Sequence, residues 1–142
     1  AIEGAGAIAA TANDLETARI LNLQPRYGVD ITESSLPQET QQSNALHFQK
    51  GCYIGQEIVE RVRSRGHVNK TLMGFEIEGG PAPASGTGIT VGDKEAGAVT
   101  SAAVSPAGLV RGLAIVRVPF NRAGEIASVE GRPAQLLEPG LR

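Results

Sequence analysis

The chain has 142 residues, of which 41% are hydrophobic and 20% are charged, and its formal net charge at pH 7 is −2. This composition is typical of a globular protein and excludes a fibrous chain, a disordered chain and a strongly basic nucleic-acid-binding protein. No apolar run approaches the roughly 20 residues of a membrane-spanning helix, and no basic segment followed by a hydrophobic run opens the sequence. We therefore expect a cytoplasmic protein with no membrane contact.

The sequence predicts a short helix over residues 13–23, followed by an ordered loop over residues 25–42. Asn13 is a residue type that caps helices, and Glu16 completes a capping-box pattern three positions later. Prolines, glycine, hydroxyls and amides after this helix favour turns. The apolar helix face would consist of Leu15, Ala18 and Leu23. The weakly patterned stretch before the helix, residues 1–12, suggests a fragment of a longer protein.

A second helix is predicted from Gly55 to Gly66, because aliphatic residues recur there at helical spacing. They are Ile54, Ile58 and Val62, with Val59 beside them. Beyond Gly66, glycines and prolines separate short apolar runs at 72–77, 88–91, 98–100 and 113–118. Such runs predict a small antiparallel barrel or sandwich. The predicted fold class is therefore α+β, with a boundary between residues 1–66 and a β-barrel domain at 67–142.

Cys52 is the only cysteine in the sequence, which excludes an internal disulfide and a metal site with several thiolates of this chain. Its place just before the second helix, next to Lys50, favours the thiolate form. Gly51 and Gly55 on either side leave the sulfur approachable. Because free cysteine is often buried, a packed and unreactive Cys52 is the alternative.

A basic cluster begins in the second half of this helix and extends just beyond it; it consists of Arg61, Arg63, Arg65, His67 and Lys70. It could bind phosphate or RNA, but arginines two positions apart on a helix point in different directions. A solvated helix surface is the simpler interpretation, so we do not expect direct nucleic-acid binding. His47 and His67 each lack a second ligand-type residue at metal spacing, and no metal site is expected.

The segment around Cys52 resembles the signature K-G-C-[FY]-x-G-Q-E of the YgfZ family, and it matches every fixed position as Lys50-Gly51-Cys52-Tyr53-Ile54-Gly55-Gln56-Glu57. Upstream, Arg19-Ile20 and residues 25–31, Pro-Arg-Tyr-Gly-Val-Asp-Ile, resemble the family stretch R-[IV]-E-A-G-x-P-R-[FY]-G-x-D-I. Residues 36–39 resemble its P-x-E turn, and residues 97–101 resemble a G-x-[IV]-T-S strand in its C-terminal barrel.

The resemblance implies a three-domain protein related to the glycine-cleavage T-protein, with folate bound near its centre and a role in maintaining iron–sulfur enzymes, including enzymes that modify tRNA. Residues 1–66 would be the end of the central T-protein-like α/β region, and residues 67–142 the third domain. The implied partners are iron–sulfur proteins or their assembly factors, and the N-terminal part of the same protein.

For the site, the resemblance implies that Cys52 and Lys50 are the reactive residues and that the rest of the motif supports them: Gly51, Tyr53, Gly55, Gln56 and Glu57. The cofactor of the intact protein would be tetrahydrofolate or a related folate, with Arg26, Tyr27 and Glu39 as binding residues. The sequence departs from the family at Leu21, where the pattern has a pterin-facing glutamate. Leucine cannot accept hydrogen bonds from the pterin.

Three functions follow, and whether the protein is an enzyme stays open. The first is a folate-linked accessory factor for iron–sulfur cluster assembly or repair, in which Cys52 holds a cluster, a metal or a one-carbon intermediate. The second is an aminomethyltransferase of the T-protein type, but its counterpart of the signature lacks this cysteine. The third is a non-catalytic module that binds a protein or RNA.

Overall fold

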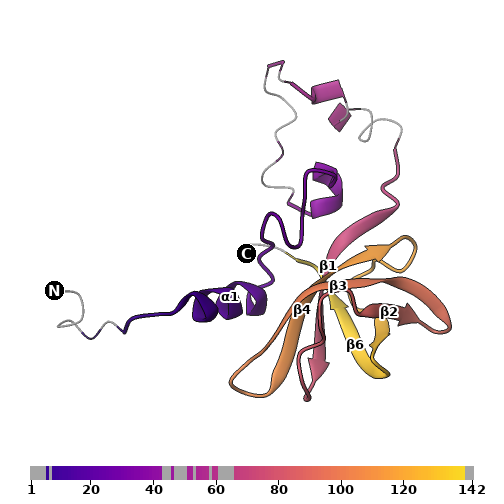
Figure 1. Ribbon diagram of the computed structural model, residues 1–142. Coiled ribbons are helices and arrows are strands. Elements are labelled where there is room, and N and C mark those ends of the chain that lie inside the picture. The colour runs from indigo at the N-terminus through magenta and orange to yellow at the C-terminus, as the bar shows by residue number, and fades with distance from the viewer. Residues whose placement is uncertain are drawn as a thin grey trace.

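The computed structural model describes residue 6 and residues 8–42, 46, 51–52, 54–57, 59–60 and 66–139. It consists of an N-terminal helical part and a six-strand barrel (Figure 1). The helices are α1 (Ala12–Leu21) and the 3-10 helix η2 (Pro37–Thr40). The strands are β1 (Lys70–Glu78), β2 (Gly88–Val91), β3 (Lys94–Val104), β4 (Leu109–Arg117), β5 (Ile126–Val129) and β6 (Arg132–Leu137).

The barrel is closed, with the strand order β1-β4-β3-β2-β5-β6 and antiparallel pairing throughout. The longest ladder joins β1 to β4, from Lys70 opposite Arg117 to Glu78 opposite Leu109. Closure pairs both edges of the sheet, so none of these strands is left as a template for aggregation. The predicted antiparallel barrel is confirmed.

The barrel core is made by every second residue of each strand, as a pleated strand requires. On β1, Met73, Phe75 and Ile77 are buried in this core. The intervening Leu72 belongs to a second cluster with Leu23 and Leu113. Residues on both sides of β1 are therefore buried, because the N-terminal part packs on the outside of the barrel.

Two glycines permit close approaches within and onto the barrel. A Cβ atom at Gly112 would lie 2.4 Å from the ring of Phe75, so a side chain there would collide with the core. A Cβ atom at Gly74 would lie 2.6 Å from Cδ1 of Leu23. Gly74 is thus the place where the N-terminal part lies closest to β1.

Helix α1 begins one residue earlier than predicted, at Ala12, and ends at Leu21 instead of residue 23. Thr11, not Asn13, is the N-cap: its side chain accepts a hydrogen bond from the Asp14 amide, and Asp14 accepts one from the Thr11 amide. The hydrogen bonds that the Asp14 carboxylate accepts from the Thr11 amide and from the Thr11 hydroxyl lower the pKa of Asp14. The predicted apolar face is also wrong, because Leu15 is 65% exposed and Ile20 is the buried residue of the helix.

The second predicted helix falls partly outside the described residues, which omit Ile58 and Val62. Gln56, Glu57, Val59 and Glu60 do have helical backbone. Val59 is buried, but Ile54 is fully exposed, so Ile54 does not belong to an apolar helix face as predicted.

Between residues 8 and 42 the described backbone contains α1, η2 and a single bridge from Tyr27 to Ile31. The α/β character of residues 1–66 and the boundary at residue 67 therefore stay predictions. In the part of the chain that the structure describes, no helix is long and apolar enough to cross a membrane.

Candidate functional site

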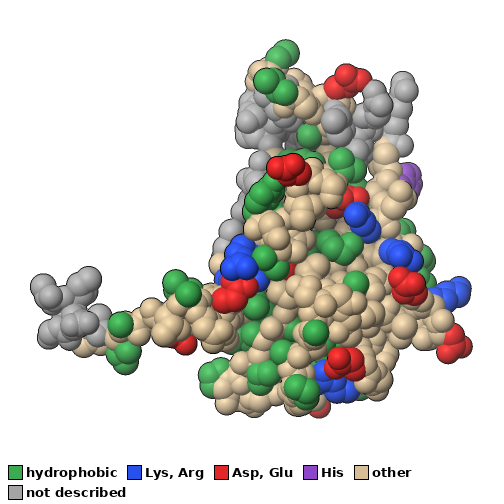
Figure 2. All heavy atoms as spheres, viewed as in Figure 1, with side chains coloured by type: hydrophobic (Ala, Val, Ile, Leu, Met, Phe, Trp, Pro, Cys, Tyr) green, Lys and Arg blue, Asp and Glu red, His purple; other side chains and the backbone are tan. Residues whose placement is uncertain are grey.

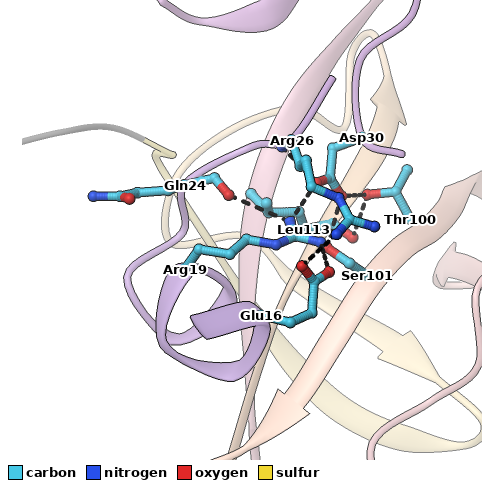
Figure 3. Close-up of polar contacts among 8 residues, drawn as sticks. All are labelled: Glu16, Arg19, Gln24, Arg26, Asp30, Thr100, Ser101 and Leu113. Carbon is cyan, nitrogen blue, oxygen red and sulfur yellow. Dashed lines mark hydrogen bonds and ion pairs between the residues drawn. The ribbon is translucent and has the colours of Figure 1, made fainter. Parts of the chain in front are cut away.

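A buried carboxylate connects the N-terminal part to the barrel (Figure 3). Oδ2 of Asp30 accepts hydrogen bonds from the guanidinium of Arg19 on α1 and from the Arg26 amide, the latter at 2.9 Å. Oδ1 accepts one from Thr100 Oγ1 and one from Ser101 Oγ, the latter at 2.6 Å, both on β3. The side chain of Asp30 is fully buried, and these four donors satisfy its charge.

Arg19 is the cationic partner in this network, and only 13% of its side chain is exposed. It also binds Glu16, the carbonyl of Gln24 at 3.3 Å and Ser101 Oγ at 3.1 Å. Burial by itself would lower the pKa of Arg19, but its bonds to Glu16 and Asp30 outweigh burial and raise the pKa. The hydrogen bond from Arg19 lowers the pKa of Glu16.

The network joins three stretches that are far apart in the sequence: Arg19-Ile20, residues 25–31 and residues 97–101. These are three of the four stretches on which the family resemblance rests outside the cysteine motif, the fourth being residues 36–39. Sequence reasoning identified each stretch but missed their contact. The signal that could have revealed this contact is the aspartate in the mostly apolar stretch 25–31. A carboxylate buried there needs a cation or several hydrogen-bond donors from elsewhere in the chain.

The three predicted folate residues have different surroundings. Arg26 has a 56% exposed side chain and forms an ion pair of 2.7 Å with Glu16. Tyr27 is 63% exposed. Glu39 is buried, and its Oε2 accepts a hydrogen bond of 3.1 Å from the Leu36 amide, so it caps η2.

At the position of the family glutamate, Leu21 contributes only its backbone carbonyl, which accepts a hydrogen bond of 3.3 Å from Arg111. Of the four folate positions, Leu21 has no polar side chain, and Arg26 and Glu39 already bind other groups of the chain. They do not make a pterin pocket by themselves, and no chemical step is assigned to folate here.

Cys52 is a free and exposed cysteine, next to the exposed Gly51. Cys52 is therefore not packed among the described residues, and its reactivity stays a prediction. Gly55 has a positive φ of 90°, which favours glycine. Gln56 is half-buried and Glu57 exposed. The predicted residues Lys50 and Tyr53 lie outside the described residues.

A cavity of about 160 Å³ lies beside Asp30, between the loop before η2 and the outside of the barrel. Its polar lining includes Asp30, Glu39, Lys70 and Thr100, and Ile31 and Ile115 are among its apolar residues. Lys70 is the member of the predicted basic cluster that reaches this cavity, while His67 is exposed and Arg61, Arg63 and Arg65 lie outside the described residues.

Cationic and anionic side chains alternate on the face of the molecule seen in Figure 2 and form no single-sign field there. Among the described residues, no group of three or more His, Cys, Asp or Glu side chains could hold a metal ion.

The barrel and the helical part packed on it define the class of protein, a T-protein-like fold. The crystal structure of the glycine cleavage system aminomethyltransferase T from Bartonella henselae matches with a TM-score of 0.72 and 17% sequence identity. The match covers 88% of this chain and 37% of that chain. Within this class, residues 69–140 match the family described as CAF17, C-terminal beta-barrel domain. The chain belongs to this family, and the resemblance to YgfZ-type proteins is confirmed.

Curated relatives carry three kinds of name. An aminomethyltransferase from Rubrobacter xylanophilus is 36% identical over 121 residues, which are 84% of this chain and 32% of the relative. The tRNA-modifying protein YgfZ of Serratia proteamaculans is 32% identical over 114 residues, 77% of this chain and 34% of the relative. The mitochondrial iron–sulfur cluster assembly factor IBA57 of Mus musculus is 49% identical over 43 residues, 30% of this chain and 12% of the relative. The chain spans about a third of the length of the first two relatives.

Proposed function

We propose that this chain is the C-terminal portion of an accessory factor for iron–sulfur cluster assembly or repair, including the repair of tRNA-modifying enzymes, and that Cys52 carries its chemistry. The observation that carries the proposal is an exposed thiol within a complete K-G-C-[FY]-x-G-Q-E run. Two relatives whose names state roles in iron–sulfur cluster assembly and in tRNA modification support it.

The thiolate of Cys52 would act as a transient ligand of a cluster or metal, which is cargo and not a resident cofactor. Iron–sulfur clusters are commonly held by four cysteine thiolates, and this chain contains one cysteine. The remaining ligands would therefore come from outside this chain, and an iron–sulfur partner is the source that we propose. Lys50 would favour the thiolate by its positive charge, and Gly51 and Gly55 would let a bulky cluster approach the sulfur.

In the intact protein, residues 1–66 would be the end of a central α/β region. Tetrahydrofolate would bind mainly to the part that precedes this chain, with Arg26, Tyr27 and Glu39 at the margin of its site. The partners would be iron–sulfur proteins or their assembly factors, in the cytoplasm, and the N-terminal part of the same protein.

The second candidate is a folate-dependent aminomethyltransferase. The observation that favours it is the 36% identity to a relative of that name over most of this chain. The leucine at position 21 weighs against it, because that position cannot contribute a carboxylate to the pterin. Cys52 separates the two candidates, since the T-protein counterpart of the motif lacks the cysteine.

An alkylation experiment on the full-length protein tests the proposal. We expect iodoacetamide to modify Cys52 readily in the folded protein, and the rate to fall several-fold in the presence of a labile [2Fe–2S] donor protein, because a thiolate bound to iron is not free to react. The apo form of the same donor is the control. Equal rates with the loaded and the apo donor would contradict the proposal.

A further inference from the structure

The described residues closest to Cys52 are exposed. Gly51 and Cys52 are exposed, Ile54 is fully exposed, and Gly55 introduces a turn with positive φ. The nearest described buried residue after Cys52 is Val59, which is 7% exposed and whose amide donates to the Gly55 carbonyl at 3.4 Å. Val59 is therefore the point at which this segment can be held.

Gln38 forms a hydrogen bond with Val59, although the two residues are far apart in the sequence. Its Nε2 donates a hydrogen bond of 2.9 Å to the Val59 carbonyl, across 21 positions. Gln38 belongs to η2, which contacts strand β1 of the barrel. In Figure 1 the described residues between 51 and 60 lie beyond η2 as seen from the barrel. The hydrogen bond thus connects the cysteine-bearing segment, through η2, to the barrel.

The backbone of η2 is itself well fixed. Pro37 opens it with a restricted φ, and Thr40 Oγ1 donates to the Pro37 carbonyl at 2.8 Å. Glu39 accepts a hydrogen bond from the Leu36 amide. Because η2 is fixed at both ends, Gln38 presents its amide from a rigid support.

The second polar atom of Gln38 indicates why a glutamine, and not an apolar residue, occupies this position. Its Oε1 is buried and has no hydrogen-bond partner among the described residues. A rotated amide would place two oxygen atoms against each other at Val59, so the contact itself fixes the orientation. An unpartnered buried acceptor opposes folding, and a leucine of similar size would avoid that cost. Gln38 is thus better explained by its bond to Val59 than by packing.

We propose that Gln38 is a positioning residue that fixes the Cys52 segment relative to the barrel. Since the thiolate of this chain would combine with ligands from outside the chain, the sulfur has to be presented at a defined place on the surface. This inference rests on the proposed function of Cys52 for its biological meaning, whereas the hydrogen bond can be tested without any client protein.

The test uses the single cysteine of this chain as the attachment point for a nitroxide spin label. Gln38→Glu keeps the size of the side chain but has no N–H to donate, and Gln38→Leu removes both polar atoms. In both variants we expect faster motion of the label at Cys52. Amide hydrogen exchange at Val59 and Glu60 should accelerate about tenfold or more, while exchange in β1 and β4 stays unchanged.

Gln24→Leu is the matched control, because Figure 3 shows the Gln24 side chain pointing away from the other residues drawn, and the hydrogen bonds of Gln24 are made by its backbone amide and carbonyl. Unchanged label motion and exchange in Gln38→Leu would overturn the inference. Uniformly faster exchange with a lower Tm would also overturn it, because Gln38 would then stabilise the whole fold. Full activity of Cys52→Ala would refute the proposed function but leave these measurements to decide the role of Gln38.

Discussion

At the scale of single residues, Asp30 is the connection between the two parts of the molecule. Its fully buried carboxylate accepts hydrogen bonds from a guanidinium on α1, from an amide in the following loop and from two hydroxyls on β3. Removing one member of a buried ion pair leaves the other with less compensation for its charge. The stability of the docked N-terminal part should therefore depend on Asp30.

Asp30→Asn should lower the free energy of unfolding by about 1.5–3 kcal/mol, because Arg19 would lose its buried partner and keep only the partly exposed Glu16 as a counter-charge. Urea denaturation of the chain measures this change. Glu95→Gln is the control, since Glu95 forms an ion pair with Arg117 in which both side chains are more than half exposed. That substitution should cost less than about 1 kcal/mol. Similar losses in both variants would contradict the assigned role of Asp30.

Glu16 should give the chain a pH-dependent contribution to stability. Its pKa is lowered, chiefly by the hydrogen bond from Arg19, so the unfolded state binds a proton more readily than the folded state. This contribution is present above the ordinary glutamate pKa of about 4.3 and is lost as the pH falls through the lowered folded pKa. In the Glu16→Gln variant, the deficit in unfolding free energy should thus shrink between about pH 6 and about pH 3. A deficit that does not change with pH would contradict this account.

At the scale of elements, the close approach of β1 and Leu23 determines how the N-terminal part docks. The side chain of Leu23, which follows α1, lies against Gly74 of strand β1. A Cβ atom at residue 74 would lie 2.6 Å from Cδ1 of Leu23. Leu23 has a positive φ of 54°, so its backbone is already strained and has little freedom to move away. Docking of the N-terminal part on the barrel therefore requires that residue 74 has no side chain.

Gly74→Ala should destabilise the chain by about 1–3 kcal/mol through this clash. Combining it with Leu23→Ala should cost less than the sum of the two single changes, because the shorter side chain vacates the space. Denaturation of the four proteins of this cycle gives the coupling energy. Gly88→Ala, a glycine whose added Cβ would meet nothing within 4 Å, is the control. Strict additivity of the two changes would refute the contact.

Element types could be predicted better than their boundaries. The barrel followed from short apolar runs between glycines and prolines, since local spacing decides whether a run is a strand. The cap of α1 was assigned to Asn13 instead of Thr11, because both residue types cap helices and both have an acid three positions later. The exposure of Ile54 could not be predicted, because spacing alone does not show whether a partner surface exists.

At the scale of the whole molecule, the strand order and the Asp30 network depend on long-range contacts that local patterns do not encode. Thr100 and Ser101 are separated from Asp30 by 70 and 71 positions. The family resemblance identified all three stretches, but only the fold shows that they meet. The motif around Cys52 was recognised from sequence, and the exposure of its sulfur came from the structure.

This chain alone should bind tetrahydrofolate weakly or not at all. Leu21 supplies no acceptor side chain, Arg26 is paired with Glu16, and Glu39 caps η2. Calorimetric titration of the chain with tetrahydrofolate should give no measurable heat of specific binding, whereas the full-length protein should bind. Tight stoichiometric binding by the chain alone would place the pocket elsewhere than proposed.

The central claim is tested most directly by expressing the full-length protein with Cys52→Ala in cells that lack it, and by assaying an iron–sulfur-dependent tRNA-modifying enzyme. Because Cys52 is exposed, the substitution should change the unfolding free energy by less than about 1 kcal/mol. No second cysteine in this chain can replace the thiolate, so the enzyme activity should fall to the level of the empty vector. Ile54→Ser, at a fully exposed neighbour, should restore activity. Full activity with Cys52→Ala at normal abundance would contradict the claim.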